Sequence, residues 1–80
     1  HDPRWCAASL DSIRALVDPN MRWLTNEEIQ LILEVVGGDV NRATRRAILS
    51  LQFKAFRQRD RTAIIAARNK LLLFECGMLR

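Results

Sequence analysis

The positions of proline and glycine limit this chain more than any other feature of its sequence. The 80 residues contain two prolines and three glycines, which are Pro3, Pro19, Gly37, Gly38 and Gly77. Both residue types interrupt helices and favour turns. Residues 40–76 contain neither, and we find no segment with the strict alternation of apolar and polar residues that is typical of strands. We therefore expect an all-α fold.

Local signals predict where the helices begin and end. Asp2-Pro3 is typical of a helix start, and Thr25 with Glu28 matches a capping box, in which each side chain accepts a backbone N–H of the other residue. Gly37-Gly38 is expected to end a helix, and Asp39 to cap the next one. The apolar residues recur at helical spacing between these signals. They predict helices over residues 3–17, 26–36, 40–58 and 62–76.

The last two predicted helices leave an alternative open. The polar segment Arg59-Asp60-Arg61-Thr62 is suited to a turn, which would fold the two helices into a hairpin around Asp60. Without that turn, one long helix would project from a smaller body and would need a second copy for stability. We favour the hairpin, and hence a small bundle of four helices. A chain of this length is expected to form a single domain over residues 1–80.

Charge is distributed unevenly between the two halves of the chain. Residues 1–38 contain three arginines and six acidic residues, which gives a net charge of −3. Residues 39–80 contain ten basic and three acidic residues, which gives +7 and accounts for the overall charge of +4. A basic C-terminal half of this kind favours an anionic partner.

Helical periodicity separates the segment 40–58 into two faces. One face is predicted to lie in the core and contains Val40, Ala43, Ala47, Ile48, Leu51 and Ala55. The opposite face combines apolar residues with arginines: Leu49, Phe53, Phe56, Arg42, Arg45, Arg46 and Arg57. Either this face binds a partner, or the segment is a central helix whose phenylalanines are also buried.

These patterns predict a non-catalytic binding domain. Guanidinium groups pair with phosphates or carboxylates, while exposed aromatic rings can stack on bases. We expect RNA or DNA binding, through the backbone, by Arg42, Arg45, Arg46, Phe53, Phe56, Arg57, Arg59 and Arg61. The alternatives are a module that docks an acidic protein partner and a self-assembly domain.

The predicted fourth helix suggests a homodimer. Its apolar residues are distributed almost all round the helix, as in a helix that is buried on more than one side: Ile64, Ile65, Leu71, Leu72, Leu73 and Phe74. An 80-residue monomer has little to cover such a helix. A two-fold pair through this helix is the prediction, and a well-covered monomeric bundle is the alternative.

Several functional classes receive no support from the sequence. The single histidine is His1, and the serines have no catalytic base at a recognisable spacing, so we expect no enzyme, small-molecule substrate or cofactor. Cys6 and Cys76 make no metal-binding spacing, although the two ends of a four-helix bundle could bring them together as a disulfide. No apolar stretch is long enough to cross a membrane, and an intracellular location is expected.

The residues from Thr25 to Leu51 resemble the second and third helices of ubiquitin-binding UBA and CUE domains. The similarity rests on the helix that starts at Thr25, the Gly38-Asp39-Val40 turn, Ala43 and the aliphatic ending at Ile48-Leu49. It implies a compact three-helix bundle with an added basic helix, and ubiquitin as a partner. Asp18–Trp23 stands where these families have a Met-Phe-Pro or Met-Gly-Phe loop.

Residues 25–51 also match a second, less specific sequence pattern. A helix, a glycine turn and a second helix are the elements of a helix-turn-helix, which would make Arg42, Arg45 and Arg46 part of a DNA-reading helix. Arg46 stands at a position that usually carries an apolar residue in that motif.

Overall fold

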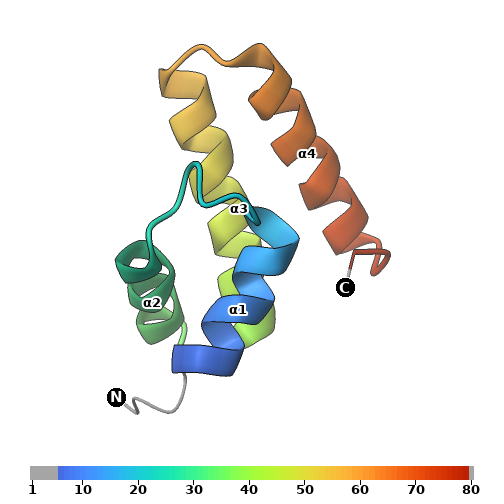
Figure 1. Cartoon of the computed structure of the whole chain (residues 1–80). Coiled ribbons are helices and arrows are strands. Elements are labelled where there is room, and N and C mark those ends of the chain that lie inside the picture. Colours follow the sequence, from blue (N-terminus) through green and yellow to red (C-terminus); the bar gives the residue numbers. More distant parts are fainter. Residues whose placement is uncertain (1–5, 80) are drawn as a thin grey trace.

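The structure is a computed structural model that describes residues 6–79, with side chains from residue 8 onward. Its helices are α1 (Cys6–Val17), α2 (Asn26–Val35), α3 (Val40–Arg57) and α4 (Arg61–Glu75). The described residues contain no strand, so the prediction of a small all-α bundle of four helices is confirmed. In Figure 1, α3 runs through the molecule, α1 and α2 lie beside its first part, and α4 folds back along it.

The predicted helix ends agree with the structure to within one residue, apart from the start of α1, which was expected at residue 3 and lies outside the described residues. The capping box is formed: Thr25 Oγ1 accepts the Glu28 N–H at 3.1 Å, and Glu28 Oε1 accepts the Thr25 N–H at 2.8 Å. Asp39 caps α3 by accepting the Arg42 N–H at 3.2 Å. These side chains satisfy backbone donors that the first turn of a helix leaves free.

The chain reverses between α3 and α4, so the alternative of one continuous helix is wrong. Arg59 adopts a left-handed conformation with φ of 57°, and its N–H donates to the carbonyl of Phe56 at 3.0 Å. The next residue, Asp60, then caps α4 by accepting the Ala63 N–H at 3.1 Å. A left-handed residue after a helix followed by a new N-cap is what a short helical hairpin requires.

The core lies against the inner face of α3. The predicted inner residues Ala43, Ala47, Ile48, Leu51 and Ala55 are all buried, and Val40 packs against the core at its edge. Side chains from the other elements meet them there: Ile13, Val17, Leu24, Ile29, Leu33, Val36 and Ala67. Three alanines on one side of α3 let the neighbouring helices approach closely.

A single copy of the chain does not cover α4 on more than one side, so the alternative of a well-covered monomeric bundle is wrong for this helix. This helix packs mainly against α3, and Ala67 is the α4 residue that is buried among those described. Ile65, Leu72 and Leu73 are instead exposed on its outer side. The apolar pattern of α4 therefore exceeds what one copy of the chain can cover.

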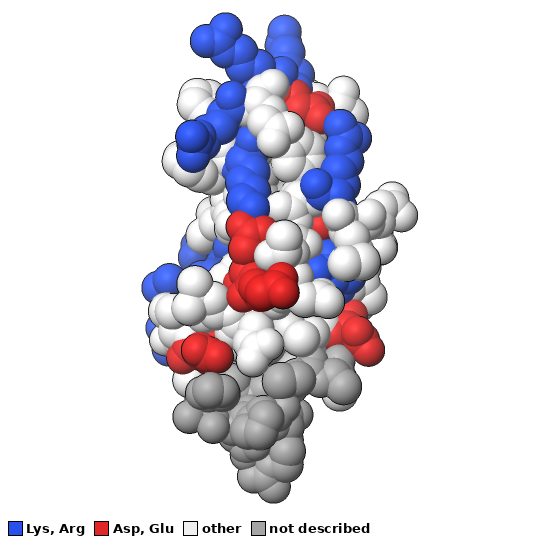
Figure 2. Space-filling view, turned by 60° about the vertical axis from the view of Figure 1, so that its left-hand side comes forward, with Lys and Arg blue, Asp and Glu red and all other residues white. Residues whose placement is uncertain are grey.

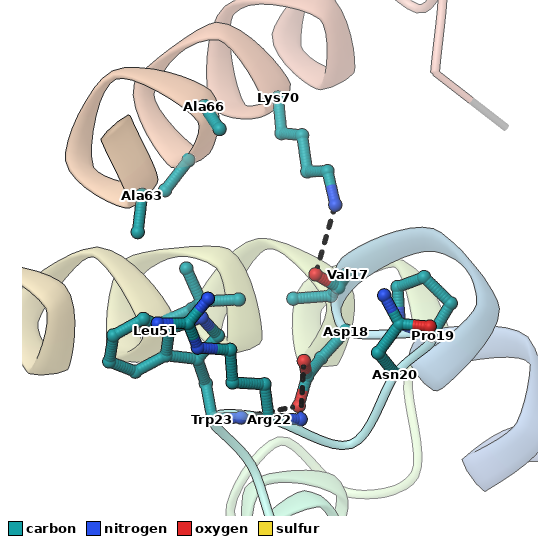
Figure 3. Close-up of a pocket in the computed structure, with 11 residues that line it drawn as sticks. Val17, Asp18, Pro19, Asn20, Arg22, Trp23, Leu51, Ala63, Ala66 and Lys70 are labelled. Carbon is teal, nitrogen blue, oxygen red and sulfur yellow. Dashed lines mark hydrogen bonds between the residues drawn. The ribbon is translucent and has the colours of Figure 1, made fainter. Parts of the chain in front are cut away.

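A cavity of about 260 Å³ lies between α4 and the connection from α1 to α2. Figure 3 shows Ala63 and Ala66 lining it from α4, with Trp23 on the opposite wall. Lys70 reaches across and donates from Nζ to the carbonyl oxygen of Val17 at 3.0 Å. This hydrogen bond connects α4 to the C-terminal end of α1.

The connection between α1 and α2 is organised by one buried carboxylate. Asp18 is 4% exposed and accepts three backbone N–H groups, from Arg22 at 3.0 Å, Trp23 at 2.9 Å and Leu24 at 2.8 Å (Figure 3). Arg14 lies 3.4 Å from the same carboxylate. Burial opposes the charged form, but the three backbone donors and Arg14 outweigh it and lower the pKa of Asp18 below its ordinary value.

Two further sequence predictions concern a disulfide between Cys6 and Cys76 and the presence of membrane-spanning segments. The Cys76 thiol is free and exposed, while the side chain of Cys6, its proposed disulfide partner, lies outside the described residues. Among the helices of residues 6–79, none combines the length and the apolar character that crossing a membrane would need.

We expect Asp18→Asn to destabilise the fold by about 1–3 kcal/mol at neutral pH, because the amide cannot accept all the backbone bonds that the carboxylate accepts. The lowered pKa of Asp18 means that the unfolded chain takes up a proton first as the pH falls. Wild-type stability should therefore decrease below about pH 4, and the variant should lose less over that interval. Urea unfolding at several pH values measures both effects. Asp11→Asn, at an exposed position, is the control, and equal stability of the two variants would contradict the assignment.

Candidate nucleic-acid interface

The side of α3 that points away from the core forms one continuous exposed surface. Seven residues lie on it at helical spacing along most of the helix, and all of them are exposed. We call this surface the outward face of α3; it consists of Arg42, Arg45, Arg46, Leu49, Phe53, Phe56 and Arg57.

Both phenylalanines of the outward face are exposed. Phe53 is 61% exposed and Phe56 is 69% exposed, so the alternative of a central helix with buried phenylalanines is wrong for the single chain. The guanidinium carbon of Arg57 lies 5.8 Å from the centre of the Phe53 ring. A positive charge is thus held beside an accessible aromatic surface, and the two groups can act on the same ligand.

The first half of the outward face carries unpaired positive charge. Among the described residues, the Arg42 and Arg46 side chains form no ion pair, whereas Arg45 binds Glu75 of α4 through Nε and a terminal nitrogen, each at 2.9 Å. Arg45 and Arg46 also line a shallow hollow between α2 and α3 with Ile32. Two guanidiniums are therefore free to bind an anion, and a third is partly neutralised.

The outward face continues onto one edge of α4. Arg61, Arg68 and Glu75 are spaced by seven residues, which places them along the same edge of a helix. Because Glu75 binds Arg45, this edge adjoins the outward face of α3. Arg61 was predicted as a site residue, but Arg68 was not. Its seven-residue spacing from Arg61 could have identified it once the hairpin was assumed.

The end of the hairpin adds further arginines. Arg59, in the connection, and Arg61, at the first position of α4, are both exposed. Arg22 lies nearby, 3.3 Å from Asp60 and over the Trp23 ring at 5.2 Å from its centre. In Figure 2 lysine and arginine predominate in the upper part of the view, where the α3–α4 connection lies, and acidic residues appear mainly below it.

The two lysines differ from these arginines, because both hold the fold together. Lys54 binds the Glu28 carboxylate and donates to the carbonyl of Trp23 at 3.0 Å, and Lys70 binds the Val17 carbonyl. The Lys54 bond is the main cause of the lowered pKa of Glu28. Lysine charge is therefore used between helices, and the basic surface is made of arginine.

The structure thus exposes every predicted site residue and brings them onto one side of the α3–α4 hairpin and its tip. The described residues contain no cluster of histidine, cysteine and acidic side chains that could hold a metal ion. Comparison with protein-family models, curated proteins and solved structures gives no match for this chain. The basic surface is therefore the feature of this chain that suggests a function.

We expect the double variant Phe53→Ser, Phe56→Ser to change the free energy of unfolding by less than about 1 kcal/mol, since both rings are exposed. Leu51→Ala, on the inner face of the same helix, should cost about 2–4 kcal/mol. Urea unfolding of both proteins provides the comparison. A large loss in the Phe53, Phe56 variant would mean that the rings are covered in solution.

Proposed function

We propose that this chain is a non-catalytic domain that binds single-stranded nucleic acid through the outward face of α3 and the adjoining edge of α4. The observation that supports this proposal most strongly is the combination of two exposed phenylalanines with unpaired arginines on one continuous surface. Aromatic rings stack on bases of any sequence, and guanidiniums neutralise the phosphates between them.

The length of the basic surface suits a backbone of several nucleotides. Arg42 and Arg57 are fifteen residues apart on α3, which corresponds to about 22 Å along the helix axis. Arg61 and Arg68 extend the positive charge sideways onto α4. A strand that follows α3 would meet guanidiniums at both ends and aromatic rings between Leu49 and Arg57.

The exposed rings favour a single strand over a duplex. The faces of stacked bases are hidden in double-stranded nucleic acid, so Phe53 and Phe56 would find no stacking partner there. A helix-turn-helix mode would use Arg42, Arg45 and Arg46 in the major groove and would leave both rings without a role.

The conformation of Arg59 agrees with this proposal. A left-handed residue costs about 1 kcal/mol more for arginine than for glycine, and the chain nevertheless has arginine there. The left-handed conformation itself follows from the end of α3, whereas the choice of arginine there does not. The side chain at this position adds positive charge at the tip of the hairpin, next to Arg57 and Arg61.

We expect Arg42→Gln with Arg46→Gln to weaken binding of single-stranded RNA or DNA about tenfold at low salt. Loss of two phosphate contacts should also lower the slope of log affinity against log salt by about 1.4. Fluorescence anisotropy with labelled oligonucleotides, single-stranded and duplex, over a salt series measures both quantities.

The control for those two arginines removes the same net charge elsewhere. Ala8→Glu with Ala15→Glu changes two exposed positions on α1, which packs on the opposite, inner side of α3. This control should bind nearly as wild type. An equal loss in both variants would show that only net charge matters. If the wild-type chain does not bind oligonucleotides at low salt, the proposal is contradicted. If it binds ubiquitin and the arginine variant does not, a protein partner is favoured.

The Arg45–Glu75 ion pair predicts a variant that gains affinity. Glu75→Gln frees Arg45 for phosphate, so single-strand binding should become severalfold tighter and the salt slope should rise by up to about 0.7. The pair is exposed, so its loss should cost at most about 1 kcal/mol of stability. Glu27→Gln, which removes the same charge from α2, is the control for the same titration. Equal gains in both variants would argue against a role for Arg45.

A further inference from the structure

The outer side of α4 carries an uncharged stripe along the whole helix. Its members are all exposed and are spaced alternately by three, one and three residues: Thr62, Ile65, Ala66, Asn69, Leu72, Leu73 and Cys76. Ile65 is 57% exposed and Leu72 is 54% exposed. We call these seven residues the α4 stripe. Every ionisable side chain of α4 among the described residues, other than the Cys76 thiol, lies off it.

The spacing of the α4 stripe matches the heptad of a coiled coil. Ile65 and Leu72 occupy the d positions, while Thr62, Asn69 and Cys76 occupy the a positions. Such a seam is buried by another helix with the same repeat. Among residues 6–79 no other helix covers it, because α4 packs mainly on α3 through its opposite side. Ala66, at the edge of the stripe, also borders the cavity beside the α1–α2 connection.

We propose that the α4 stripe is the interface with a second copy of this chain, which forms a two-fold dimer. Asn69 lies midway along the stripe, so a two-fold axis beside it brings the two Asn69 side chains together. An amide both donates and accepts, and it satisfies an identical amide across the axis. An apolar partner would leave the Asn69 amide without hydrogen bonds, whereas a second copy supplies them.

The charge of the chain also favours this surface for self-association. Two copies that each carry a net charge of +4 repel one another, and the arginine-bearing outward face of α3 is unsuited to contact with itself. The α4 stripe is uncharged, so it allows close approach at the lowest electrostatic cost. The exposed apolar pair of α2, Leu31 and Val35, is bordered by Glu27 and Glu34 and lacks the heptad continuation.

The size of α4 sets the expected strength of the pair. Fifteen residues span about 22 Å, which limits a helix-to-helix contact to about 1,000 Å² in total, at the lower end of specific interfaces. The dimer is therefore expected to be weak and in rapid exchange with the monomer.

Sedimentation equilibrium or light scattering of the full chain, with reductant to keep Cys76 free, tests the proposal. The average mass should rise from 9.2 kDa towards twice that value between about 10 µM and about 1 mM. Ile65→Glu with Leu72→Glu should remain monomeric throughout. Leu31→Glu with Val35→Glu, at similarly exposed positions on α2, changes the charge equally and should still dimerise.

Salt separates this proposal from nucleic-acid binding. Raising the salt concentration from about 0.1 M to about 0.5 M screens the repulsion between two positive copies, so dimerisation should strengthen while nucleic-acid binding weakens. A wild-type chain that stays at 9.2 kDa over the whole range would overturn the dimer without affecting the proposed function. A dimer lost in the α2 variant and retained in the α4 variant would overturn it as well.

Discussion

Burial of one side of α3 is the constraint on which the rest of this structure depends. Ala43, Ala47 and Ala55 on that side are fully buried, and they let the other helices pack closely around a single central element. The inner side of α3 packs against the other helices, so the outward face, with its arginines and phenylalanines, is exposed to solvent. The same arrangement leaves α4 packed mainly against α3, which exposes the α4 stripe.

The basic residues are divided by chemistry between fold and surface. Lys54 and Lys70 end on backbone carbonyls that other elements present, and thereby fix α2 and α4 relative to α1 and α3. Guanidiniums instead populate the exposed side, where their planar geometry suits phosphate oxygens. Arg45 belongs to both groups, because its bond to Glu75 aligns the edge of α4 with the outward face of α3.

Much of the fold could be predicted because it depends on local signals. Caps at Thr25 and Asp39, the glycine turn and the polar segment 59–62 mark the helix ends, and periodicity identified the inner face of α3. The role of Asp18 was not predicted, because its hydrogen bonds with the N–H groups of Trp23 and Leu24 form only when the chain has folded into the turn. Exposure of Phe53 and Phe56, and the addition of Arg68 to the site, depend on how α4 folds back, which periodicity alone does not specify.

We propose that nucleic acid binds on the outward face of α3. The most direct test is to titrate the isotope-labelled chain with a short single-stranded oligonucleotide and to follow the NMR signals of backbone amides and arginine side chains. We expect the largest changes between Arg42 and Arg57, at the hairpin tip and at Arg68, with little change on α1. Changes concentrated on α1 or α2, or none at low salt, would contradict it.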